Sequence, residues 1–245
     1  KSMEYPTKRD GVLRLGSSVM LHRDSRDYDV DTIFDDTEVS LRDNNLKNMI
    51  VSGADDRLLK SVLSSFMIWM SRRNDVEMKL HIFGYDKSIS EKYGNRPNVY
   101  FHKSVQEQLD EMERQIEDTT GGYDINVFVE PDKYSEFTQS AGSIRSNPAV
   151  DSFKKVLDRT ALESGITIVY CKSYKTLRSS MAYILGYAPI HITAVGDMEN
   201  LKYAMSDNMH LVSGEFDVPS RDAIKAYYYN KDTEKSGKVI LYKPA

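Results

Sequence analysis

MIVSGADDRLLKSVLSSFMIWM, residues 49–70, is the stretch that decides the fold. Residues 49–53 are mostly apolar and end at a glycine, which predicts a short buried strand. Residues 58–73 place apolar side chains three and four positions apart, which predicts a helix with one apolar face. That face comprises Leu59, Val62, Leu63, Phe66, Met67 and Met70. A buried strand followed at once by a long helix is typical of a βαβ unit.

The same alternation of short apolar segments and helical segments continues along the chain. Further strands are predicted at residues 79–85, 98–101, 124–129, 166–170, 189–193 and 210–212, and further helices at 104–117, 150–163, 174–186 and 198–205. Because helical segments separate the strands, the crossovers predict a mainly parallel sheet. Helices then cover both faces of the sheet, so the expected fold class is an α/β three-layer sandwich.

The two ends of the chain have a different pattern. Residues 12–34 predict two short antiparallel strands, and residues 223–229 and 238–242 predict a C-terminal β-hairpin across a polar turn. We therefore expect a single domain of 245 residues in three parts. These parts are N-terminal strands and a loop at 1–45, a core at 46–215 and the hairpin at 216–245.

The composition of the chain argues against nucleic acid and membrane surfaces as partners. The chain has 33 Lys and Arg against 37 Asp and Glu, a net charge of −4, so no basic field draws in nucleic acid or an anionic membrane. No apolar run approaches the roughly 18–20 residues that span a bilayer. Cys171 is the single cysteine, which excludes an internal disulfide and fits a reducing compartment. We expect a cytosolic piece.

The strand at 49–53 ends where a nucleotide-binding protein carries its phosphate loop. A working loop reads GxxxxGK[ST], because glycines let backbone N–H groups surround a phosphate. Here residues 53–61 read GADDRLLKS, with leucine at the second glycine position and Lys60-Ser61 one residue late. Asp55 and Asp56 place negative charge where the polyanion would lie. Two interpretations stay open: an ordinary helix N-terminus, or residual nucleotide binding.

Two more strand ends complete this edge, because ligands of parallel sheets bind at the carboxyl ends of the strands. The strand at 124–129 is followed by Glu130-Pro131-Asp132, where an active motor needs an acid for magnesium and a base for water. Glu130 could hold a metal weakly, or the strand simply stops at a proline turn. After the strand at 166–170, Ser173 stands where a sensor of the γ-phosphate is expected.

The candidate nucleotide-binding remnant is therefore a set of six residues. It comprises Gly53, Asp55, Lys60, Ser61, Glu130 and Ser173. No catalytic residue is predicted, and the only cofactor left open is weakly bound ATP with magnesium. The five histidines form no HxxxH or HExxH pair, so no metal site is predicted, and His81 and His191 are interpreted as packing or interface residues.

Taken together, residues 35–215 resemble the FtsK/SpoIIIE-like motor domain, a P-loop NTPase fold of the RecA/FtsK type. Four segments carry the likeness: NNLKNMIVSGADDRLLKSVLSSFMIWM (44–70), KLHIFGYDK (79–87), EMERQIE (111–117) and LESGITIVYCKS (162–173). The layout matches, whereas the catalytic motifs fail at each strand end. Motor-like domains without intact catalytic motifs are typical of the terminal domain of EssC/EccC-type ATPases, the membrane-anchored motors of type VII secretion.

The resemblance implies a role and a set of partners. It implies a pseudo-ATPase on the cytoplasmic side of a bacterial membrane, anchored only through its parent protein, with neighbouring motor domains in the same chain. It also implies recognition of secreted WXG100-type proteins, for which the 16 tyrosines offer an amphipathic aromatic surface. The alternatives are a non-hydrolysing ATP-binding regulatory domain and an accessory domain of a DNA translocase.

Overall fold

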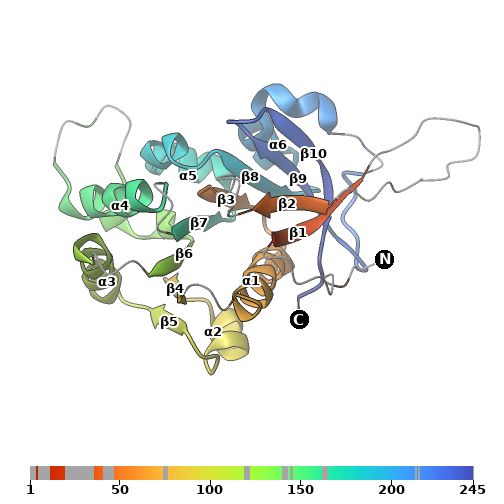
Figure 1. Cartoon of the computed structure of the whole chain (residues 1–245). Helices are drawn as coiled ribbons and strands as arrows, with labels where there is room; N and C mark the ends of the chain where they lie inside the picture. The colour runs from red at the N-terminus through yellow and green to blue at the C-terminus, as the bar shows by residue number, and fades with distance from the viewer. Residues whose placement is uncertain are drawn as a thin grey trace, which may run out of the picture.

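The computed structural model of the chain describes residue 4 and residues 12–19, 36–40, 47–73, 77–118, 122–139, 143, 146–161, 165–212, 214 and 216–244. Within these residues ten strands form one sheet (Figure 1). The strands are β1 (Val12–Val19), β2 (Asp36–Ser40), β3 (Met49–Ser52), β4 (Met78–Phe83), β5 (Val99–His102), β6 (Tyr123–Val129), β7 (Gly165–Cys171), β8 (Ile190–Ala194), β9 (Ile224–Asn230) and β10 (Lys235–Leu241). The α-helices are α1 (Asp56–Ser71), α2 (Lys87–Tyr93), α3 (Val105–Glu117), α4 (Pro148–Arg159), α5 (Tyr174–Ser180) and α6 (Met198–Met205).

Parallel strands form the core of the sheet. The strand order is β2-β1-β10-β9-β8-β3-β7-β6-β4-β5, and every pairing from β8 to β5 is parallel. Beyond β8, the strands β9, β10, β1 and β2 extend the sheet with antiparallel pairings. The structure therefore confirms the predicted mainly parallel sheet and the C-terminal hairpin. The three-part division at residues 45 and 215 stays a prediction.

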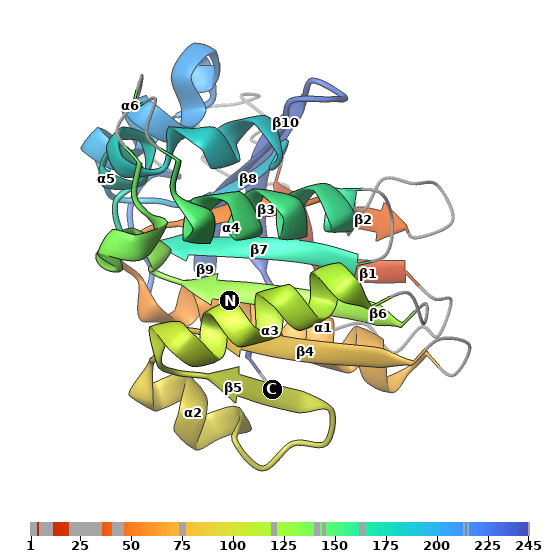
Figure 2. The same cartoon turned by 90° about the vertical axis from the view of Figure 1, so that its left-hand side faces the viewer.

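Helices cover both faces of the sheet. On one face, α1 and α2 pack against alternate side chains of the strands, such as Val51 and Ile82. On the other face, α3, α4, α5 and α6 enclose a second apolar cluster around Phe128 and Val169. Figure 2 shows α3 and α4 lying across β4, β6 and β7. The predicted three-layer sandwich follows from this alternation, because successive strand side chains point to opposite faces.

The sequence of α1 explains why this helix lies centrally in its layer. Asp55 caps its N-terminus by accepting a hydrogen bond from the Arg57 N–H group. Its apolar face runs to Phe66 and Trp69, whose rings meet edge to face, and Trp69 also contacts Tyr123 of β6. Trp69 is only 1% exposed. Burial of these aromatic side chains fixes α1 on the sheet and thereby the loop that precedes it.

Several local predictions were wrong. Residues 210–212 do not form a strand, since Ser206–Leu211 is a 3-10 helix (η5). The helix predicted at 174–186 ends at Ser180, and a separate 3-10 helix (η4) follows at Ala182–Gly186. The short helix α2 was not predicted. The second N-terminal strand, β2, lies beyond the predicted range 12–34.

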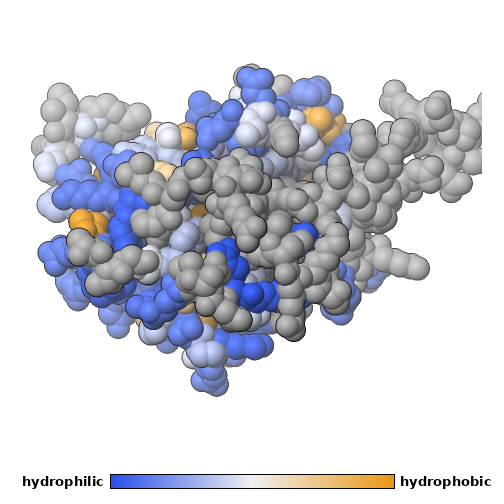
Figure 3. Space-filling model, in the orientation of Figure 1, coloured by the Kyte–Doolittle hydropathy of each residue, from blue (hydrophilic) through white to orange (hydrophobic). Residues whose placement is uncertain are grey.

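The helices in the part of the chain that the structure describes are at most 16 residues long. No helix there combines the length and the apolar character that a membrane crossing requires. The face drawn in Figure 3 is mainly hydrophilic where its residues are described, with hydrophobic residues as isolated spots. Isolated apolar side chains are normal on a protein surface and need no partner.

Candidate functional site

The three predicted strand ends lie next to one another. β7 is paired with β3 on one side and with β6 on the other. At the carboxyl edge, the Gly53 N–H donates to the Cys171 carbonyl at 3.0 Å, and the Glu130 N–H donates to the Tyr170 carbonyl at 2.8 Å. The segments that follow the three strands therefore share one edge, where a nucleotide would bind in an active motor.

The loop between β3 and α1 has only three residues, 53–55, because α1 already begins at Asp56. The Asp55 carboxylate accepts from the Arg57 N–H at 2.9 Å and from the Arg57 guanidinium at 2.7 Å. Arg57 also donates to the Ser220 and Arg221 carbonyls, at 2.8 Å each. A carboxylate of the protein itself therefore occupies the anion position at the N-terminus of α1.

The charge of Asp55 is fixed by this contact. Burial alone would raise the pKa of Asp55, but hydrogen bonds and the charge of Arg57 outweigh burial and lower it. The same contact raises the pKa of Arg57. Asp55 is therefore ionised at neutral pH, and its negative charge opposes a phosphate at this helix end.

Gly53 shows how tightly the loop is held. Its φ is +141°, a conformation open essentially to glycine alone, and a Cβ at this position would lie 2.5 Å from the Ala194 Cβ of β8. The Gly53 carbonyl accepts from the Tyr170 hydroxyl at 3.0 Å. The backbone of Gly53 is thus packed against β8, and its carbonyl is bonded to β7, in this structure.

Lys60 and Ser61 are the fifth and sixth residues of α1, beyond its first turn. The Ser61 side chain is fully buried, and its hydroxyl donates to the Tyr242 carbonyl at 2.6 Å. Ser61 thus joins α1 to the end of the chain and is not open to a magnesium ion in this structure.

Lys60 lies beside α2. Burial alone would raise the pKa of Asp86, the N-cap of α2, but hydrogen bonds from Ser88 and Ile89 and the nearby Lys60 charge lower it. The Lys60 carbonyl accepts from the Tyr93 hydroxyl at 3.2 Å. These contacts place the Lys60 backbone against Tyr93 and its charge near Asp86, at the start of α2.

Glu130 and Ser173 also have partners within the protein. Glu130 has a φ of 48°, which is uncommon for a non-glycine residue, and its carboxylate lies 2.7 Å from the Lys133 ammonium. Ser173 caps α5 by accepting from the Thr176 N–H at 3.2 Å. Of the six candidates, the structure brings Gly53, Asp55, Glu130 and Ser173 to one edge and leaves Lys60 and Ser61 farther along α1.

Asp132 is a residue at this edge whose setting the sequence did not indicate. Its Oδ1 atom is buried and has no hydrogen-bond partner. Burial and the neighbouring Glu130 charge raise the pKa of Asp132. Both carboxylates raise the pKa of the Cys171 thiol further, beyond the effect of its burial. Cys171 is therefore an inert buried thiol rather than a nucleophile.

A buried polar network closes the end of β3. The Ser52 and Thr193 hydroxyls lie 3.0 Å apart, and the Asn200 amide donates to Ser52 at 3.3 Å. The Asn200 carbonyl oxygen accepts from the Tyr174 N–H at 2.6 Å. Sequence reasoning missed this network because its members are up to 148 residues apart, as Ser52 and Asn200 are.

A groove lies at the opposite end of the sheet, where β4 and β5 begin. It has a volume of about 350 Å³ and is lined by the second half of α1, the end of α2 and the segment before β5. Its apolar lining comprises Met67, Ile68, Met70, Met78, Pro97 and Val99, and its charged residues are Arg73, Glu77 and Arg96. Flexible methionine side chains adapt to different partners, so the groove suits an apolar peptide segment.

The tyrosines that the structure describes are divided between surface and core, and Tyr85 and Tyr100 are exposed. Tyr170, Tyr174 and Tyr227 are buried in the core. Burial raises the pKa of Tyr183, whose hydroxyl donates to the Phe137 carbonyl at 2.8 Å. These rings border the core because a buried phenol needs both apolar neighbours and a hydrogen-bond partner.

A domain with this sheet order and these two layers of helices has the α/β fold of the P-loop NTPase class. Three solved structures share the fold. The cytoplasmic domain of the Thermomonospora curvata type VII secretion ATPase EccC has a TM-score of 0.60 at 10% identity, over 98% of this chain and 27% of that chain. The same organism's EccC (ATPases 2 and 3), in complex with a signal sequence peptide, has a TM-score of 0.57 at 11% identity, over 97% and 41% of the two chains.

The third structure is the pCW3 conjugation coupling protein TcpA, in its monomer form with ATPγS. It has a TM-score of 0.65 at 8% identity, over 100% of this chain and 70% of that chain. No protein-family model and no curated protein matches the sequence. The chain spans 27% to 41% of the EccC chains. With sequence identities of only 8% to 11%, the similarity to these structures establishes the fold. It confirms, for the fold, the predicted resemblance to FtsK/SpoIIIE-like motors.

Proposed function

We propose that this chain is a motor-like domain of a protein-secretion coupling protein, which binds a segment of the secreted protein and does not hydrolyse ATP itself. In this proposal the parent is a membrane-anchored type VII secretion protein of the EssC/EccC type, and the domain lies on the cytoplasmic side. Its partners are WXG100-type substrates and the neighbouring motor domains of the same chain.

The contacts made by the loop at 53–55 are the main support for this proposal. The Asp55 carboxylate bonds the N-terminus of α1, Gly53 packs tightly against Ala194, and the Ser61 hydroxyl is buried against the Tyr242 carbonyl. Hydrolysis needs a phosphate cradle and a residue that positions water, and both are worth many orders of magnitude in rate. The polar side chains at these strand ends serve caps and ion pairs instead.

The methionine-rich groove supports the binding part of the proposal. Its volume is within the range of pockets that hold ligands, and its charged rim of Arg73, Arg96 and Glu77 suits an amphipathic helical segment. The EccC structure with a signal sequence peptide shares the fold over 97% of this chain, and we extend peptide binding from that protein to this one.

We expect Met70→Lys to weaken peptide binding at least tenfold, about 1.4 kcal/mol. The added ammonium would lose hydration when an apolar peptide side chain covers it. The measurement is fluorescence anisotropy with a labelled synthetic peptide that carries the helical signal segment of a WXG100-type protein.

Met198→Lys is the matched control, because Met198 is 46% exposed on α6 and does not line the groove. It should bind the peptide like the unmodified chain. Equal affinity of both variants and the unmodified chain would refute the groove as the binding site. Circular dichroism of both variants checks that they are folded.

A second candidate is a regulatory domain that binds ATP without hydrolysis. A cavity of about 280 Å³ beside the loop favours it, since Arg57 and Lys225 line this cavity together with Asp55 and Asp197. Two of these residues already have partners: Arg57 is paired with Asp55, and the Lys225 ammonium donates to the Val218 carbonyl at 3.0 Å. A DNA-translocase accessory role has less support, because the net charge is −4.

A further inference from the structure

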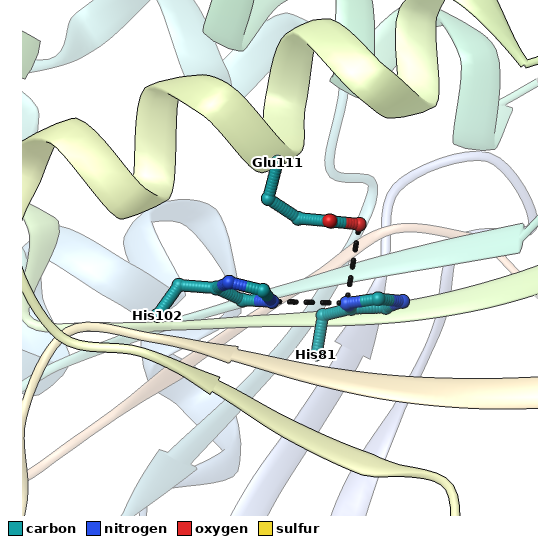
Figure 4. A group of neighbouring side chains, drawn as sticks. All are labelled: His81, His102 and Glu111. Atoms are coloured by element: carbon teal, nitrogen blue, oxygen red, sulfur yellow. Dashed lines mark hydrogen bonds and ion pairs between the residues drawn. The ribbon is translucent and has the colours of Figure 1, made fainter.

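Two histidines and a glutamate converge at the other edge of the sheet, away from the loop at 53–55. His81 lies in β4, His102 ends β5, and Glu111 lies in α3, which covers both strands (Figure 4). Parallel pairing places His102 opposite Phe83, two residues beyond His81 and on the same face. The fold therefore brings together three side chains whose spacing in the sequence is irregular.

The ligand atoms of these residues point at one another. His81 Nδ1 lies 3.0 Å from His102 Nε2 and 3.2 Å from Glu111 Oε1, and the three atoms all lie within 4.8 Å of one another. Zinc bonds of about 2.0–2.2 Å would put tetrahedral ligands about 3.3–3.6 Å apart. The two distances from His81 are therefore close to those of a zinc site, and side-chain movement would bring the third pair into range.

A surrounding shell orients His81. Its other nitrogen, Nε2, lies 3.4 Å from Asp124 Oδ1, and the Arg159 guanidinium holds Asp124 Oδ2 at 2.8 Å. A carboxylate behind a histidine is the arrangement that fixes the imidazole tautomer at metal sites. His81 Nε2 makes no hydrogen bond in this structure, and a proton on it, facing Asp124, would leave the Nδ1 lone pair available to a metal beside His102 and Glu111.

Two carboxylates and two arginines lie in or next to the cluster. His102 is half-buried, and burial lowers its pKa, which favours the neutral imidazole that binds a metal. Glu111 and Asp124 are balanced by Arg114 and Arg159. Arg114 and Gln115 donate to Glu111 and hold its carboxylate in place, although a metal must share Oε1 with both.

We propose that His81, His102 and Glu111 form a binding site for a zinc-class transition metal ion, with water as the fourth ligand. Imidazole nitrogen and carboxylate oxygen are ligands that suit Zn²⁺. The ion would tie the edge strand β5 and the neighbouring β4 to α3. This site departs from the expectation, drawn from histidine spacing, that the chain has no metal site.

Calorimetric titration of the chelator-treated chain with Zn²⁺ at pH 7.5 tests the site. We expect one ion per chain with a micromolar or lower Kd, and a higher melting temperature with zinc present. His102→Gln should weaken binding at least tenfold and remove this thermal shift. His210→Gln is the matched control, because His210 is exposed and outside the cluster.

Glu111→Gln provides a second variant if His102→Gln fails to fold, and it too should weaken zinc binding at least tenfold. Absence of stoichiometric binding to the folded, unmodified chain would overturn the proposal. It would also be overturned by unchanged affinity in a folded His102→Gln or Glu111→Gln variant. These results are independent of peptide binding in the groove and of ATP.

Discussion

Replacing Arg159 with methionine is expected to lower the free energy of unfolding by about 3–5 kcal/mol, because the change leaves a buried carboxylate without its ion-pair partner. Asp124 is only 3% exposed, and the Arg159 guanidinium lies 2.8 Å from it. Methionine keeps most of the side-chain volume, so the loss of stability would come from the missing charge rather than from poorer packing. Urea unfolding at pH 7 measures it.

The effect of this substitution should depend on pH. Burial alone would raise the pKa of Asp124, but interactions with His81 and Arg159 outweigh burial and lower it. A carboxylate with a lowered folded-state pKa stabilises the fold above its unfolded pKa of about 3.9, and this contribution is lost as the pH falls through the folded-state pKa. The difference between the two proteins should therefore shrink in acid.

Lys79→Met is the control for a surface charge. Lys79 forms an ion pair with Glu77 whose N–O distance is 3.7 Å, and both side chains are at least one-third exposed. Such pairs contribute about 0–1 kcal/mol. An equal loss for Lys79→Met and Arg159→Met, or no loss for Arg159→Met, would contradict the buried-pair account.

Gly53→Ala is expected to destabilise the chain by about 2–4 kcal/mol. The backbone conformation at φ +141° costs a non-glycine residue about 1–3 kcal/mol, and the contact with Ala194 adds an overpacking cost of similar size. Thermal and urea unfolding measure the change. The prediction tests whether the loop at 53–55 is as rigid as the contacts imply.

Gly186→Ala is its matched control, because a Cβ at Gly186 meets no atom within 4 Å. Its expected effect is within about 0.5 kcal/mol, as for most surface substitutions. If Gly53→Ala were as stable as this control, the loop could shift away from β8, and a phosphate cradle would become possible after all.

The sequence allowed prediction of the fold because its helical and strand patterns are long and regular. The apolar face of α1 and the capping box of α3 mark those helices directly. Short elements were not predicted correctly. Helix α2 has seven residues, too few for a clear helical period. The 3-10 helix η5 contains apolar residues whose pattern resembles that of a strand.

The candidate site could be predicted only in part. The strand ends were placed correctly, since parallel strands align their carboxyl ends at one edge. The partners of the side chains could not be predicted, because they come from distant segments: Ser61 bonds Tyr242, 181 residues away. The same holds for His81 and His102, which meet only through the pairing of β4 with β5.

We propose that the contacts of the loop at 53–55 prevent this domain from using ATP. Calorimetric titration with Mg-ATP to millimolar concentration, followed by a phosphate-release assay on the same sample, tests it most directly. We expect no heat of ATP binding and no ATP turnover, either in the unmodified chain or in Lys60→Ala. Heat of binding with turnover that Lys60→Ala abolishes would contradict it.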